Sequence, residues 1–123
     1  IMAVTQSRDN RTIIAGADLS GSQFLFAKLD SAAEAVLCAN GDGTIGVIEV
    51  GAASGNACTI THSGKVMVKC GGTVTIAGDV GIDANGKAVD AASTDIIVGR
   101  AYEAGVTDQV IAIELILAAN AKA

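Results

Sequence analysis

His62 is the only histidine in this sequence, and imidazole is the side chain best suited to acid–base chemistry near neutral pH. It follows an alternating apolar stretch and precedes Ser63 and Gly64, so we expect it at a strand end or in a turn. A serine–histidine–aspartate triad could be drawn with Ser54 or Ser63, but the sequence lacks the G-x-S-x-G elbow that exposes a nucleophilic serine. We therefore interpret His62 as a solvated or hydrogen-bonded turn residue and predict that the chain is not an enzyme.

Residues 41–46, GDGTIG, match the G-x-G-x-x-G pattern of dinucleotide-binding loops. In those loops a helix follows the glycines, because its N-terminus binds the pyrophosphate. Here the next residues are VIEV at 47–50, which are typical of a strand. The match is interpreted as a glycine-rich turn.

Oxygen-bearing side chains gather at Asp79, Asp83, Asn85 and Asp90, a composition that would suit Ca²⁺. The EF-hand spacing and its closing glutamate are missing, however, and aspartate and asparagine are also ordinary turn residues. We interpret these residues as turn residues.

The three cysteines, Cys38, Cys58 and Cys70, are odd in number and contain no C-x-x-C pair. We expect three reduced, partly buried thiols, which indicates production in a reducing cytoplasm. Zinc is not expected, because the cysteines and the single histidine lack ligand spacing. The sequence therefore predicts no catalytic residue, no metal site and no cofactor.

Composition excludes several partners. The chain has 123 residues and a formal net charge of -5, so we expect no nucleic-acid binding. No apolar run approaches the roughly 18 residues of a membrane span, and no membrane association is expected. The charge is uneven, because residues 1–14 carry Arg8 and Arg11 against Asp9 alone, whereas the remainder is acidic.

Short alternating apolar stretches separated by turn residues predict strands. They are expected at residues 23–29, 35–39, 44–50, 57–61, 65–70, 73–77, 80–83, 87–89, 96–102 and 110–117. Residues 65–70 and 73–77 should form a hairpin through Gly71 and Gly72. Residues 80–83 and 87–89 should form another through a type I′ turn at Asn85 and Gly86. No exact internal repeat is present.

This spacing predicts a mostly β fold, a small β-sandwich or barrel with an extended N-terminal arm. We divide the chain into an arm and hinge (1–22), a β body (23–117) and a short C-terminal tail (118–123). The arm has apolar anchors at Val4 and at Ile13 and Ile14. Spacing alone leaves both sandwich and barrel open.

Six segments of the body resemble the bacteriophage capsid cement, or decoration, proteins of the small β-tulip type. They are FLFAKLD at 24–30, GVIE at 46–49, AGDVGID at 77–83, GKAV at 86–89, VGRAYEAG at 98–105 and IAIEL at 111–115. The resemblance extends over most of the body in matching order.

The resemblance implies a β-tulip-like body that binds the outside of the expanded head and stabilises it against internal pressure. It also implies a homotrimer, the major capsid protein as partner, and a location on the outer surface of a virion assembled in the host cytoplasm. The arm would lie across seams between capsid subunits, with contacts expected from Val4, Arg8, Arg11, Ile13 and Ile14.

Two other classes of function remain open. The chain could be a virion surface adhesion module that binds a host receptor or glycan, although so few aromatic residues offer little stacking surface for a sugar ring. A small hydrolase would have to use His62.

Overall fold

Alternating β-branched and small residues form nine strands in the computed structural model, which describes residues 6–118 and 120–123. The strands are β1 (Gln6–Ile14), β2 (Phe26–Leu29), β3 (Ala35–Leu37), β4 (Gly46–Val50), β5 (Ala57–Lys69), β6 (Asp79–Ile82), β7 (Ala88–Asp90), β8 (Gly99–Ala101) and β9 (Val110–Leu115). They form one antiparallel sheet in the order β3-β2-β4-β5-β9-β8-β6-β7, and β1 pairs with β5. Within this described part no helix is long and apolar enough to cross a membrane.

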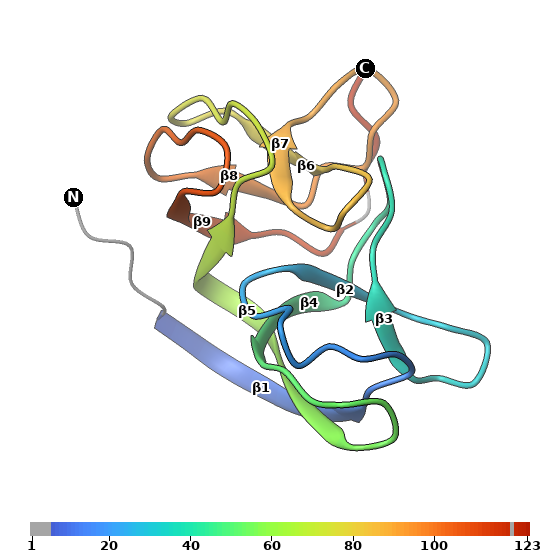
Figure 1. Cartoon of the computed structure of the whole chain (residues 1–123). Helices are drawn as coiled ribbons and strands as arrows, with labels where there is room; N and C mark the ends of the chain where they lie inside the picture. Colours follow the sequence, from blue (N-terminus) through green and yellow to red (C-terminus); the bar gives the residue numbers. More distant parts are fainter. Residues whose placement is uncertain (1–5, 119) are drawn as a thin grey trace.

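The sheet curls into two lobes that share β5 (Figure 1). Strands β1 to β4 lie with the first half of β5, and β6 to β9 lie with its second half. The prediction of a mostly β fold, a small sandwich or barrel, is confirmed.

Strand β5 corrects the expected position of His62. The sequence predicted two strands separated by a turn at residues 62–64, but β5 is continuous over thirteen residues. Strand β1 pairs along this stretch, from Ile14 opposite Ala57 to Gln6 opposite Lys65. His62 therefore lies inside a strand, because a partner strand spans the expected break.

The hairpin predicted from residues 65–70 and 73–77 is wrong. Residues Lys65–Lys69 pair instead with β9, and Thr73–Ala77 forms no strand beyond a single bridge at Val74. Strand β9 offers six consecutive residues, VIAIEL, whereas the nearby segment follows two glycines. A distant strand that offers five paired residues has therefore replaced the local partner.

The hairpin between β6 and β7 is confirmed, but its turn is not type I′. A type I′ turn needs positive φ at both central residues, and here Gly86 has positive φ (75°) while Asn85 does not. The Asp83 carboxylate accepts the N–H groups of Asn85 (2.8 Å) and Lys87 (2.9 Å). The loop is thus a three-residue connection closed by an aspartate.

The β2–β3 hairpin has the same loop. The Asp30 carboxylate accepts the N–H groups of Ala32 (2.9 Å) and Glu34 (3.0 Å). Ala33 has a positive φ (59°), as Gly86 has at the equivalent position of the other loop. The turns that follow also match, because the Asp42 and Asp95 carboxylates each accept an N–H three residues earlier in the chain. The two lobes are therefore built alike.

We describe the lobes as a first repeat, residues 11–61, and a second repeat, residues 66–114. From residue 22 onward, every pair of equivalent residues is as far apart in the sequence as Asp30 and Asp83. Before residue 22 the paired residues are two positions further apart, because Ser20 and Gly21 of the first repeat have no counterpart in the second. Identical residues at equivalent positions include Gly16 and Gly71, Asp30 and Asp83, Ala35 and Ala88, Gly46 and Gly99, and Ile60 and Ile113.

The cores match as well. The cluster of the first repeat consists of Ala15, Leu19, Ala27, Ala35, Ile48, Cys58 and Ile60. Its equivalents in the second repeat all belong to the other cluster: Cys70, Val74, Val80, Ala88, Ala101, Ile111 and Ile113. Each repeat therefore closes its sheet over the same set of inward-facing positions.

The first repeat also covers the second. Its outer-face residues Phe26, Cys38 and Val47 are buried in the core of the second repeat. Backbone bonds cross the same boundary, since the Phe26 N–H donates to the Gly86 carbonyl (2.8 Å) and the Gly41 N–H to the Ile82 carbonyl (2.9 Å). The two repeats consequently form one packed body.

The chain ends are tied to this body. Residues 6–14 of the expected arm are strand β1, whereas Val4 lies outside the described residues. In the tail, the Lys122 carbonyl accepts the Thr94 N–H (2.8 Å) and the Asn120 carbonyl accepts the Ile97 N–H (2.8 Å). The division into arm, body and tail stays a prediction, but residues 6–14 of the arm pair with β5 and the tail is hydrogen-bonded to the connection between β7 and β8.

Equivalent glycines allow the strands to approach each other. A Cβ on Gly46 (φ 151°) would lie 2.2 Å from the Thr61 carbonyl oxygen, and one on Gly99 would lie 2.5 Å from that of Glu114. We predict that Gly46→Ala lowers the free energy of unfolding by about 2–4 kcal/mol and Gly99→Ala by about 1–3 kcal/mol, measured by urea denaturation. Gly21→Ala is the control, because its Cβ meets nothing within 4 Å. Equal stability of all three variants would contradict the repeat.

Candidate functional site

His62 has no catalytic partner in the described residues. Its Nε2 is buried without a hydrogen bond, so neither Ser63 nor any other described side chain is bonded to it. Burial lowers the pKa of His62, the Arg11 charge lowers it further, and the Asp9 charge opposes both. This geometry holds a neutral imidazole and offers no nucleophile.

The aspartates suggested for Ca²⁺ have separate structural partners. Asp83 closes its hairpin loop, Asp90 accepts the N–H and hydroxyl of Thr75, and Asp79 pairs with Arg100. Across residues 6–118 and 120–123, no three His, Cys, Asp or Glu side chains are grouped so as to hold a metal ion.

The cysteines are free and buried. Burial raises the pKa of Cys38 and of Cys70 to about 11. Since the thiolate is the reactive form, these side chains act as small apolar core residues rather than nucleophiles.

The predicted capsid-contact residues on β1 differ in exposure. Arg11 is exposed and pairs with Asp9 (3.0 Å), and Ile14 is 42% exposed. Ile13 instead packs against the core of the first repeat. Val4 and the side chain of Arg8 lie outside the described part, so their contacts stay predictions.

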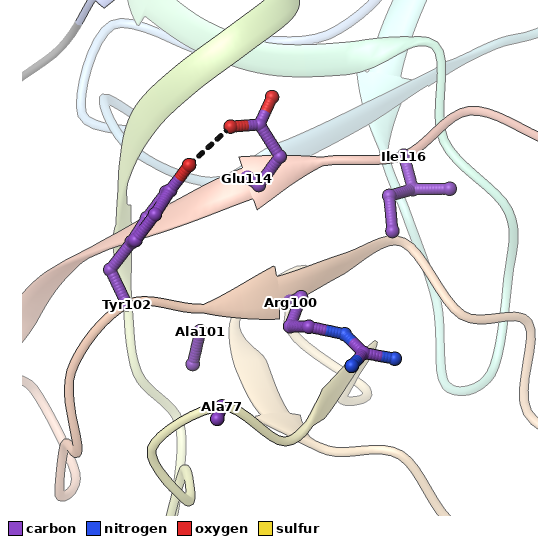
Figure 2. Close-up of a pocket in the computed structure, with 6 residues that line it drawn as sticks. All are labelled: Ala77, Arg100, Ala101, Tyr102, Glu114 and Ile116. Atoms are coloured by element: carbon purple, nitrogen blue, oxygen red, sulfur yellow. Dashed lines mark hydrogen bonds between the residues drawn. The ribbon is translucent and has the colours of Figure 1, made fainter.

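A pocket beside β8 and β9 is the site that sequence reasoning missed. It encloses about 400 Å³, near the lower end of ligand-binding pockets. Its lining residues, drawn in Figure 2, are Ala77, Arg100, Ala101, Tyr102, Glu114 and Ile116. The side chains of Tyr102 and Ile116 lie at opposite ends of this group, and Ala77 lies on the loop before β6. The walls are thus mostly apolar with a few polar groups at the rim.

Tyr102 is fixed by polar contacts rather than by burial. Its hydroxyl donates to the Glu114 carboxylate (2.5 Å), and the Lys65 ammonium lies 4.9 Å from the centre of its ring, within cation–π range. The hydrogen bond to Glu114 is the main cause of a raised pKa at Tyr102, followed by burial and the Glu114 charge. The aromatic wall of the pocket is therefore held in one orientation.

A row of alternating charges crosses the sheet beside the pocket. In the strand register Lys65 lies opposite Glu114, Glu114 opposite Arg100, and Arg100 opposite Asp79. Asp79 pairs with Arg100 (3.2 Å) and with Lys122 of the tail (3.3 Å). Exposed ion pairs contribute little stability, so the main effect of this row is a polar outer face on the second repeat.

Neither the family models nor the curated proteins contain a match to this chain. Among solved structures, the chain is similar to the N base of the head fiber protein gp8.5 of bacteriophage phi29. The TM-score is 0.70 at 14% sequence identity, and the likeness covers 94% of this chain and 97% of that chain. At this level of identity the two proteins share a fold.

The contact between Tyr102 and Glu114 can be tested by titration, since Tyr102 is the only tyrosine. The carboxylate favours the protonated phenol, so we predict a titration midpoint above the ordinary value of 10.0. Any stability from this contact is complete below that ordinary value and is lost as the pH rises through the raised pKa. Tyrosinate absorbance should show a lower midpoint in Glu114→Ala, while Glu49→Ala is the control. An unchanged midpoint in Glu114→Ala would contradict the assignment.

Proposed function

We propose that this chain is a non-enzymatic structural protein of a bacteriophage head, and that it decorates the outside of the expanded capsid. The observation that carries the proposal is the fold, which matches the base of a phage head fiber over nearly the whole length of both chains. The resemblance of the body segments to capsid decoration proteins supports the same assignment independently of the fold.

The proposed mechanism needs no chemistry. A protein that binds the expanded shell but not its precursor stabilises the expanded state by mass action. The stabilisation per site is RT ln(1 + L/Kd), where L is the free concentration of the protein. The proposed partner is the major capsid protein. A homotrimer would bind through several weak contacts at once, and such multivalent binding releases slowly.

The size of the chain favours this kind of function. Its accessible surface is 5853 Å², and a standard interface buries roughly 800 Å² on each partner. Contacts with other copies and with the shell would therefore involve a large share of the surface. Exposed apolar side chains suited to such contacts include Ile14, Leu29, Ile76 and Val106.

Binding to heads is the decisive measurement. We predict that the purified chain co-sediments saturably with expanded, undecorated heads of its source phage and raises their melting temperature. Unexpanded proheads, which present different seams, serve as the control and should bind weakly. Absence of binding to both shells would contradict the proposal and favour a surface adhesion module.

Strand β1 provides a second test. Deleting residues 1–14 would remove a strand of the sheet, so single substitutions at exposed positions are more informative. We predict that Ile14→Asp and Arg11→Glu each weaken head binding at least tenfold, which corresponds to about 1.4 kcal/mol.

Val50→Asp is the matched control for this test, because Val50 is also an exposed apolar strand residue but belongs to β4. Wild-type affinity in both β1 variants would contradict the assignment of β1 as a capsid contact, without affecting the proposal that the chain binds heads.

A further inference from the structure

Phe24 and Ala77 occupy equivalent positions in the two repeats. The Phe24 N–H donates to the Ile48 carbonyl (2.8 Å), and the Ala77 N–H donates to the Ala101 carbonyl (2.9 Å). Both residues have positive φ, 70° and 60°. This conformation is uncommon for residues other than glycine, so the shared value fixes the same direction for the two side chains.

The side chains at this position differ in size. The first repeat carries Phe24 and Ile48 at these two backbone positions, whereas the second carries two alanines, Ala77 and Ala101. These two alanines line the pocket in Figure 2. The pocket therefore borders the position at which the first repeat carries a phenylalanine.

We propose that this pocket binds a phenylalanine or tyrosine side chain of a protein with a different sequence. The inference rests on the proposed function, under which that protein is a capsid subunit. The first repeat acts as the internal template, because it shows which side chain this backbone arrangement accommodates. Burying an aromatic ring in a preformed pocket is also the usual form of a binding hot spot.

The aromatic residues of this sequence are few, and each has a place in the structure. The sequence contains two phenylalanines, one tyrosine and no tryptophan. Phe26 is fully buried in the core, Tyr102 forms a wall of the pocket, and Phe24 occupies the equivalent position in its own repeat. The proposal therefore assigns the aromatic side chain to a different protein.

The charged residues beside the pocket indicate which charge the partner carries next to its aromatic side chain. Lys65, Arg100 and Lys122 lie along the outer face, whereas Glu114 and Asp79 are the acids in the same row. Glu114 is engaged by Tyr102, and Asp79 is shared by two of the basic side chains. The local excess of positive charge favours a partner segment with an acidic residue next to its aromatic one.

Filling the pocket from within tests the proposal. Ala77→Phe grafts the residue of the first repeat onto the second, at a φ that the first repeat already combines with phenylalanine. The control is Ala33→Phe, since Ala33 is an exposed alanine with nearly the same φ, 59°. Thermal unfolding establishes whether both variants fold. If Ala77→Phe does not fold, Ala77→Leu replaces it, because leucine fills the pocket with a smaller side chain.

The variants are compared in the sedimentation assay with expanded heads. We expect Ala77→Phe to weaken binding at least tenfold and Ala33→Phe to bind like the wild type. Binding by all three proteins with equal affinity would overturn the pocket proposal and leave the proposed function intact.

A second measurement decides the case in which even the wild type fails to bind heads. A capped tripeptide with phenylalanine between two glutamates is titrated into the protein, and the methyl signals of Ala77 and Ala101 are followed by NMR. We expect both signals to shift at millimolar peptide and to stay in place with the alanine-centred peptide. In Ala77→Phe, which lacks the Ala77 methyl, the Ala101 signal should not shift with either peptide. Unshifted signals with the phenylalanine peptide would overturn the proposal.

Discussion

The structure depends on the continuity of strand β5, whose two halves belong to different repeats. Its first half pairs with β1 and β4 and closes the first repeat, and its second half pairs with β9 and begins the second. Because a single strand carries both halves, the two lobes cannot rotate freely about a linker. The outer face of β2 and β4 is held against the neighbouring core, where Phe26 and Val47 are buried. Truncating a buried aromatic residue typically costs about 3–5 kcal/mol, so this contact is a large part of what joins the lobes.

The outer face of the first repeat packs on the second repeat, whereas the outer face of the second repeat packs on neither. The two outer faces therefore differ in their residues. The face of the first repeat that is covered carries Phe26 and Val47, whereas the equivalent positions of the second repeat are Asp79 and Arg100. The tail packs at this end of the molecule. The Lys122 carbonyl accepts a hydrogen bond from the Thr94 N–H, just as the Ile82 carbonyl accepts one from the N–H of Gly41, the residue equivalent to Thr94. Stacked repeat proteins need such polar terminal faces, since an apolar one would add further copies without limit. The charge row is thus explained by its place at the end of the stack.

Sequence patterns were sufficient for the elements whose partners are close in the chain. The alternation at Val80 and Ile82 and the turn residues around Asn85 placed the β6–β7 hairpin correctly, although the same Asn-Gly pair also suits the three-residue loop that forms. The patterns failed where a distant partner decides the outcome. Residues 62–64 resemble a turn, and only pairing with β1 keeps them in a strand. The repeats escaped detection because identity survives at a few scattered positions and two residues of offset intervene near Gly21.

The pocket could not be found from the sequence for a related reason. It arises from a side chain that is small, and an isolated alanine at position 77 carries no signal of its own. Only the alignment of the repeats shows that Phe24 stands at the equivalent place. Positions that stay identical, such as Asp30 with Asp83 and Gly46 with Gly99, close turns or permit close backbone contact. The fold constrains the residue type at these identical positions. It does not constrain the residue type at outer-face positions that differ between the repeats, such as Glu49 with Tyr102 and Thr61 with Glu114. In a body built twice from one plan, recognition can be specified at these differences, and the pocket lies among them.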